Sequence, residues 1–77
     1  MNELLNHIFR IVREYETTRW TLPTVTDIVV RYMKDFGYQA EITDSMHRDF
    51  RIIDVDGHRF RIIRNKGWLR YDVIQVY

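Results

Sequence analysis

Three histidines are the residues of this chain best suited to metal binding or acid-base chemistry. They are His7, His47 and His58, and no two of them are four residues apart, as two ligands on one helical face would be. The chain has no cysteine, which removes thiolate metal sites and cysteine nucleophiles. Ser45 lacks the flanking glycines of a nucleophilic serine at a strand-to-helix turn. We therefore expect no catalytic residue, no metal and no cofactor, and hence a protein that is not an enzyme.

A small ribonuclease is the enzyme that these residues would support best. Such an enzyme can use a histidine such as His58 for acid-base catalysis and nearby arginines to stabilise developing charge. The candidate set is His58, Arg59, Arg61 and Tyr71. Pairing of Arg59 with Asp54 across a hairpin, and packing of Tyr71 under the helices, would explain the same residues without a reaction. Ribonuclease activity is therefore the weaker hypothesis.

Arginines near large aromatic residues point instead to the binding of another macromolecule. These residue types are enriched in the hot spots of protein interfaces, and they also hold phosphates and stack on bases in proteins that bind single strands. The predicted partner-binding residues are Arg51, Phe60, Arg64, Trp68 and Arg70. The leading hypothesis is a protein-binding regulator or inhibitor that occludes its partner's surface, as small proteins of phages and other mobile elements do. The alternatives are binding of RNA or single-stranded DNA, and a homodimeric structural domain.

Length and composition limit these alternatives. A chain of 77 residues can form one hydrophobic core, so we expect a single domain over residues 1–77. The net charge of +1 argues against tight non-specific binding of nucleic acid, although residues 46–77 carry seven Lys and Arg against four Asp and Glu. The absence of cysteine, and of a basic segment followed by an apolar run near Met1, predicts a cytoplasmic protein without a membrane partner.

Two N-terminal segments have apolar residues at every third or fourth position, which predicts two helices. The first extends from Asn2 to about Thr18. The second follows a short connection at residues 19–22, is capped by Thr24 and ends at Gly37. Because the connection is short, the two helices should form an antiparallel hairpin.

The apolar period changes to two after Gly37, which predicts strands. Asp56-Gly57 is a strong signal for a two-residue hairpin loop, and Asn65-Lys66-Gly67 indicates a three-residue loop. The predicted fold class is therefore α+β, with the helical hairpin packed on one face of a C-terminal antiparallel β-meander of three to four strands, in the order ααββββ.

The two loops set the register of the strands and thereby the two faces of the sheet. Val55 should lie opposite His58, and a three-residue second loop places Ile62 opposite Arg70, whereas a four-residue loop would flip the last strand. With three residues, the face under the helices contains Phe50, Ile52, Ile63, Leu69, Tyr71 and Val73, with Arg61 toward its edge. The other face contains Ile53, Val55, Phe60, Ile62, Trp68 and Ile74, mixed with Arg51, His58, Arg64, Arg70 and Asp72.

Both predicted faces are substantially apolar, although two helices of this length can cover only one of them. An antiparallel sheet with one wet face normally alternates apolar and polar residues, so a second apolar face asks for another cover. The simpler interpretation is that β-branched and aromatic residues are favoured in strands wherever they point. A partner on the uncovered face is the hypothesis that gives this pattern a function.

Overall fold

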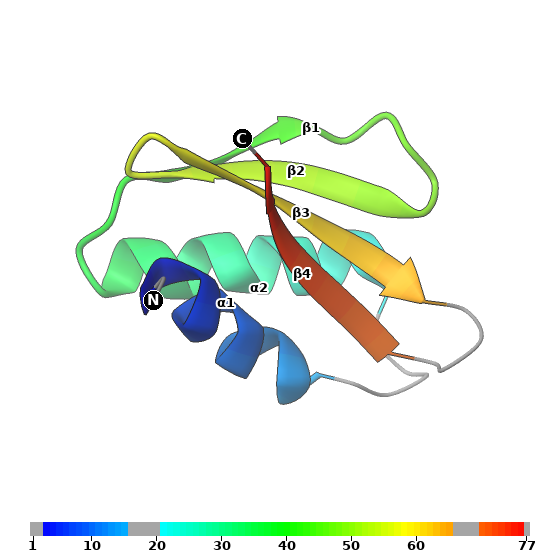
Figure 1. Ribbon diagram of the computed structural model, residues 1–77, viewed down its shortest axis with the longest axis horizontal. Coiled ribbons are helices and arrows are strands. Elements are labelled where there is room, and N and C mark those ends of the chain that lie inside the picture. The colour runs from blue at the N-terminus through cyan, green and yellow to red at the C-terminus, as the bar shows by residue number, and fades with distance from the viewer. Residues whose placement is uncertain (1–2, 16–20, 66–69, 77) are drawn as a thin grey trace.

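The chain folds into two helices followed by four antiparallel strands, which confirms the predicted α+β class and the ααββββ order. The computed structural model describes residues 3–15, 21–65 and 70–76. The elements are α1 (Glu3–Arg13), α2 (Leu22–Asp35), β1 (Ala40–Asp44), β2 (Phe50–Val55), β3 (His58–Asn65) and β4 (Arg70–Val76). Figure 1 shows both helices on the same side of the sheet, running in roughly opposite directions.

The apolar stripes of both helices point toward the sheet, as their spacing predicts. In α1 the buried residues are Ile8, Ile11 and Val12, and Glu3 lies in the first turn, where the helix dipole favours an anion. In α2 one side is buried from Leu22 to Met33. Among the described residues, no helix combines the length and the hydropathy needed to cross a membrane.

The start of α2 differs from the sequence-based prediction. Thr21 caps the helix, and its Oγ1 accepts a hydrogen bond from the backbone N–H of Thr24 at 3.4 Å. Leu22 and Pro23 then form the first turn, where proline is tolerated because first-turn N–H groups have no partner within the helix. The predicted cap at Thr24 is therefore wrong, and residue 22 belongs to the helix rather than to the connection.

The strands pair in sequence order, and the first predicted loop is confirmed. Asp56 and Gly57 join β2 to β3 and both have positive φ, at 49° and 81°. Val55 lies opposite His58, so the predicted register of this hairpin holds along its whole length. Dihedral angles of this kind match the right-handed twist of the flanking strands, which is why an Asp-Gly pair favours the hairpin.

The register between β3 and β4 contradicts the prediction. Arg70 pairs with Asn65, and Val73 pairs with Ile62, the residue that the three-residue loop placed opposite Arg70. Residues 66–69 therefore separate the paired ends, which is the four-residue alternative. Because the shift between the two registers is three residues, an odd number, every side chain of β4 shares a face with the other set of β3 side chains than predicted.

The helices cover the residues of β2 and β3 that were predicted to be open, together with Tyr71 and Val73 of β4, which were predicted to be covered. The sheet contributes the following buried residues to the core: Ala40, Ile53, Val55, Phe60, Ile62, Tyr71 and Val73. They pack against α1, which lies under β4, and against α2, which lies under β1 and β2. Phe50, Ile52 and Ile63, predicted to face the helices, lie on the other side. The cause is the register of β4, because it adds Tyr71 and Val73 to the face of Phe60 and makes that face the more apolar.

Candidate protein-binding face

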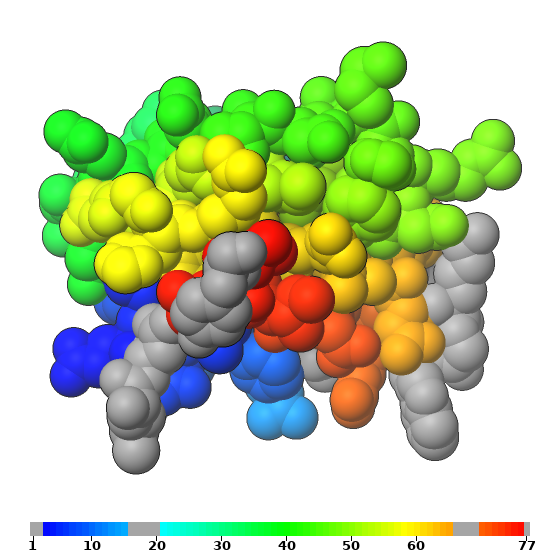
Figure 2. Space-filling model, turned by 45° about the horizontal axis from the view of Figure 1, so that its top comes forward, coloured from blue at the N-terminus to red at the C-terminus, as the bar shows by residue number. Residues whose placement is uncertain are grey.

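The side of the sheet turned away from the helices has no cover in the part of the chain that the structure describes. Figure 2 looks obliquely onto this side, where atoms of β1 to β4, coloured green to red, form the surface and α1 in blue appears only below them. We name it the open face and define it by the alternate residues of β2, β3 and β4 that point away from the core. These are Phe50, Ile52, Asp54, Arg59, Arg61, Ile63, Asn65, Arg70, Asp72, Ile74 and Val76.

The centre of the open face is aliphatic and contains one arginine. Arg61 on β3 lies between Ile52 on β2 and Ile74 on β4, which are its register partners. The neighbouring row of the sheet places Ile63 beside Phe50. Ile74 is 44% exposed and the other three apolar side chains are half-buried. The described structure therefore leaves this apolar patch in contact with water.

Ion pairs flank this aliphatic centre on two sides. On one side, Arg59 Nε donates to Asp54 Oδ1 at 3.0 Å, and this hydrogen bond is the main reason why the pKa of Arg59 is raised. On the other side, Arg70 Nε lies 3.6 Å from Asp72 Oδ1. Both pairs are solvated, so they add little to stability but neutralise the charges at the rim of the open face.

Arg61 is the arginine of the open face that has no such partner among the residues that the structure describes. Its guanidinium carbon lies 4.6 Å from the centroid of the Phe50 ring, a cation-π contact. Its Nε is buried, yet no hydrogen-bond acceptor for it occurs in residues 3–15, 21–65 or 70–76. The Phe50 ring also stacks on His47, with centroids 3.9 Å apart. The arginine head is thus held in place by an aromatic ring and not by a carboxylate.

The five predicted partner-binding residues are not brought together. Phe60 is 0% exposed and lies at the centre of the core, because its face is the one under the helices. Arg51 and Arg64 lie on the same side of the sheet as Phe60. Arg51 Nη1 donates to the carbonyl oxygens of residues 47 and 50. Arg70 lies on the open face, in its ion pair. Trp68 lies outside the described residues.

The residues that form the centre of the open face were missed as a group. Ile52, Arg61 and Ile63 were predicted to face the helices, and Ile74 was predicted to be open but beside other neighbours. The pairing of Asn65 with Arg70 brings them together, and no local pattern in the sequence identifies that pairing.

The residues proposed for a ribonuclease do not converge. Arg59 and Arg61 lie on the open face. His58 and Tyr71 lie on the opposite face, under which the helices pack, and Tyr71 is buried there. A sheet separates the histidine from the arginines, so the four groups cannot surround one phosphate. Burial raises the pKa of Tyr71, which keeps its hydroxyl protonated over a wider pH range.

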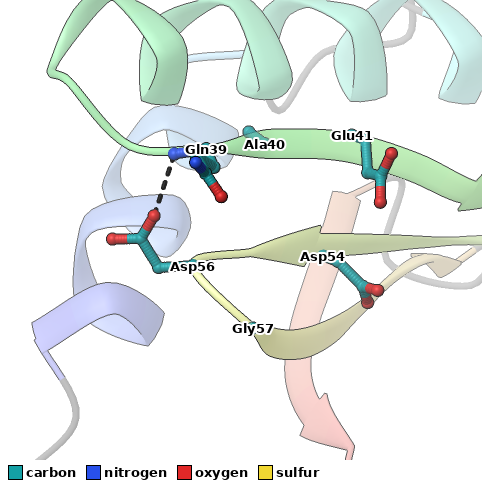
Figure 3. A pocket seen from close by; sticks show the side chains of 6 residues that line it. All are labelled: Gln39, Ala40, Glu41, Asp54, Asp56 and Gly57. Atoms are coloured by element: carbon teal, nitrogen blue, oxygen red, sulfur yellow. Dashed lines mark hydrogen bonds between the residues drawn. The ribbon is translucent and has the colours of Figure 1, made fainter.

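A hollow of about 270 Å³ lies where β1 begins and where β2 turns into β3, as Figure 3 shows. Its three carboxylates are those of Glu41, Asp54 and Asp56. Asp56 Oδ1 accepts a hydrogen bond from the backbone N–H of Gln39 at 2.8 Å, and Asp54 is paired with Arg59. Within the described ranges, no three His, Cys, Asp or Glu side chains are grouped to hold a metal ion. Two of the three carboxylates thus serve the local structure.

Comparison with known proteins adds no family, because no family model, no curated protein and no solved structure matches this chain. The functional inference therefore depends on the residues of the open face and on the contacts that they make.

Proposed function

We propose that this protein is a non-enzymatic binding module that recognises another protein through the open face, and that it acts as a regulator or inhibitor by occluding its partner's surface. The observation that supports this proposal is the aliphatic centre around Arg61, which is left in contact with water while ion pairs occupy its rim. An apolar core with a polar rim is the usual anatomy of a protein interface, and arginine is over-represented at its energetic centre. A cytoplasmic location, expected from the lack of cysteine, is part of the same proposal.

The charges of the open face favour a protein over a nucleic acid. Three arginines, at positions 59, 61 and 70, stand against Asp54 and Asp72, and β1 adds Glu41 and Asp44, whose register partners lie on the same side. Among the described residues, four carboxylates against three arginines make a poor surface for a phosphate backbone, since binding of nucleic acid relies on a net positive surface. In the part of the chain that the structure describes, the aromatic ring of this face is that of Phe50, which already contacts His47 and Arg61 and is poorly placed to stack on a base.

The same charges disfavour a second copy of this chain packed symmetrically on the centre of the face. In a two-fold arrangement the same patch meets itself, which would bring two Arg61 guanidinium groups together in an apolar setting. Like charges cost free energy there because little water screens them. A different protein avoids this repulsion.

A matched pair of substitutions tests the proposal. Ile74→Asp places a charge in the centre of the open face, whereas Ile42→Asp makes the same change at a similarly exposed strand position, 38% against 44%, on the helix side of the sheet. Affinity-tagged wild type and both variants would be used to capture proteins from the cells that produce the chain. We expect one protein to be retained by wild type and by Ile42→Asp and lost with Ile74→Asp, because the substitution replaces an apolar contact at the centre of the face with a hydrated carboxylate that a partner would have to desolvate. Retention by folded Ile74→Asp would overturn the proposal.

A further inference from the structure

The open face contains an arginine whose surroundings indicate what its partner presents. We infer that Arg61 binds the carboxylate of an aspartate or glutamate side chain that the partner protein inserts between Ile52 and Ile74. This inference depends on the proposed function and goes further, because it assigns a chemical class to the partner's central residue. It starts from the contrast between Arg61 and the two other arginines of the same face.

Arg59 and Arg70 each have a carboxylate of this chain within 4 Å, whereas Arg61 has none among the described residues. A buried hydrogen-bond donor without an acceptor is uncommon in folded proteins, and each case asks for a specific reason. Arg61 as a whole is half-buried, so the carboxylate of a partner can approach its guanidinium from solvent, although Nε itself is covered by atoms of this chain.

The neighbours of Arg61 explain why the described residues do not supply the acceptor. On the adjacent strands its register partners are Ile52 and Ile74, and neither has a polar side chain. The closest carboxylates along those strands are two residues away, in Asp54 and Asp72. Asp54 accepts from Arg59, and Asp72 lies beside Arg70 and accepts from Asn65 Nδ2 at 3.4 Å. Arg61 is therefore surrounded by apolar groups and by carboxylates that already have partners.

The same surroundings prepare Arg61 to bind a carboxylate tightly. The Phe50 ring, 4.6 Å from the guanidinium carbon, fixes the arginine head, so less side-chain entropy is lost when a ligand binds. Aliphatic side chains on both sides would exclude water once a partner covers them, and charged hydrogen bonds are stronger in such an environment. The planar guanidinium also matches a carboxylate through two parallel N–H groups.

The charge of the face selects a carboxylate of a protein rather than a phosphate. A single carboxylate of −1 charge neutralises Arg61, whereas a phosphodiester chain would bring further negative charges close to Asp54 and Asp72. The partner residue is thus an acidic side chain with aliphatic neighbours, which would lie against Ile63 and Ile74.

The side chain of Arg61 provides a direct spectroscopic test, because an arginine Nε–H gives its own signal in a ¹⁵N-correlated NMR spectrum. The probes are the capped tripeptides acetyl-Val-Glu-Val-amide and acetyl-Val-Gln-Val-amide, and inorganic phosphate, at pH 6.0, where the glutamate is ionised. The Nε–H signal of Arg64, which is exposed on the other side of the sheet, is the internal control.

We expect the glutamate peptide to shift the Arg61 signal saturably and at least five-fold more than it shifts the Arg64 signal, and the glutamine peptide to cause no saturable shift. Equal shifts of both arginines, no shift of Arg61, or a larger response to phosphate than to the glutamate peptide would overturn the inference.

Capture experiments separate this inference from the proposed function. If Ile74→Asp loses the captured protein while Arg61→Met retains it with unchanged affinity, the open face binds a protein but not through a carboxylate, and only the inference fails. If both variants retain the protein, the proposed function fails as well. We expect Arg61→Met to weaken binding by at least ten-fold and Arg61→Lys to restore only part of it, because lysine cannot donate two parallel hydrogen bonds.

Discussion

Substitution of two adjacent isoleucines on β3 tests which face of the sheet is covered by the helices. Ile62 is 0% exposed in the core, whereas Ile63 is half-buried on the open face. The change to alanine removes the same atoms at both positions. At Ile62 it leaves a cavity among packed residues and should lower the free energy of unfolding by about 2–5 kcal/mol. At Ile63 water fills the space that is left, and the loss should be roughly 1 kcal/mol.

The small size of the domain determines which substitutions can be measured. A domain of 77 residues has a total stability of about 4–12 kcal/mol, so Ile62→Ala can leave it largely unfolded. The milder pair Ile62→Val and Ile63→Val keeps the fold, with a loss of about 0.5–1.5 kcal/mol at position 62. That loss lowers the thermal midpoint by roughly 2–12 °C, against a few degrees at position 63. Urea unfolding followed by circular dichroism measures both pairs. Equal losses, or a larger loss at Ile63, would refute the assignment of the two faces.

Three further substitutions test individual features of the fold. Thr21→Ala removes the cap of α2 and should cost about 1 kcal/mol in urea unfolding, whereas no loss would show that the cap at 3.4 Å contributes nothing. Gly57→Ala at φ 81° meets no atom within 4 Å, so its cost of about 1–2 kcal/mol would come from backbone strain alone, and an unchanged midpoint would contradict this. Burial raises the pKa of Tyr71, with a smaller opposing effect of Arg64. The folded state therefore holds this proton more tightly than the unfolded state does. The resulting stabilisation is complete below the ordinary pKa of about 10 and is lost as pH rises through the folded pKa. Unfolding of Tyr71→Phe at a series of alkaline pH values should accordingly show a shallower loss of stability than wild type, and an identical slope would count against the burial of this hydroxyl.

Local signals in the sequence were sufficient for the order of elements. Apolar spacing identified both helices, and Asp56-Gly57 fixed the β2-β3 hairpin together with its register, because both residues tolerate the positive φ that the turn requires. The position of the α2 cap was less certain from sequence, since residues 21 and 24 are both threonine, a residue type that is common at helix N-caps. Thr21 is the cap because Pro23 fits the first turn of the helix.

The faces of the sheet could not be derived in the same way, because they depend on whether the register of β4 against β3 shifts by an odd or an even number of residues. Glycine at position 67 suggested a three-residue loop, and this interpretation grouped Tyr71 with Ile63. The observed pairing of Asn65 with Arg70 groups Tyr71 with Phe60 instead. No local pattern decides between the two, since both give apolar faces. The total apolar surface buried against the helices decides, and that is a property of the whole fold.

The residues of the candidate site also depend on the register of β4. Arginine and aromatic residues were the predicted residue types, but Phe60 belongs to the core and Arg61, its neighbour in sequence, belongs to the open face. Arg61 stands out because its buried Nε has no hydrogen-bond acceptor among the residues that the structure describes. Such a feature becomes visible only when the register partners Ile52 and Ile74 are known.

The most direct measurement of protein binding through the open face is site-specific photo-cross-linking inside the cells that produce the chain. A photoreactive amino acid would replace Ile74 in one variant and Ile42 in another, at positions of similar exposure on opposite sides of the sheet. We expect position 74 to form a discrete cross-linked product with one other protein and position 42 to form none. Cross-links to that protein from position 42 alone, or to nucleic acid or a second copy of the chain from position 74, would contradict the proposed function.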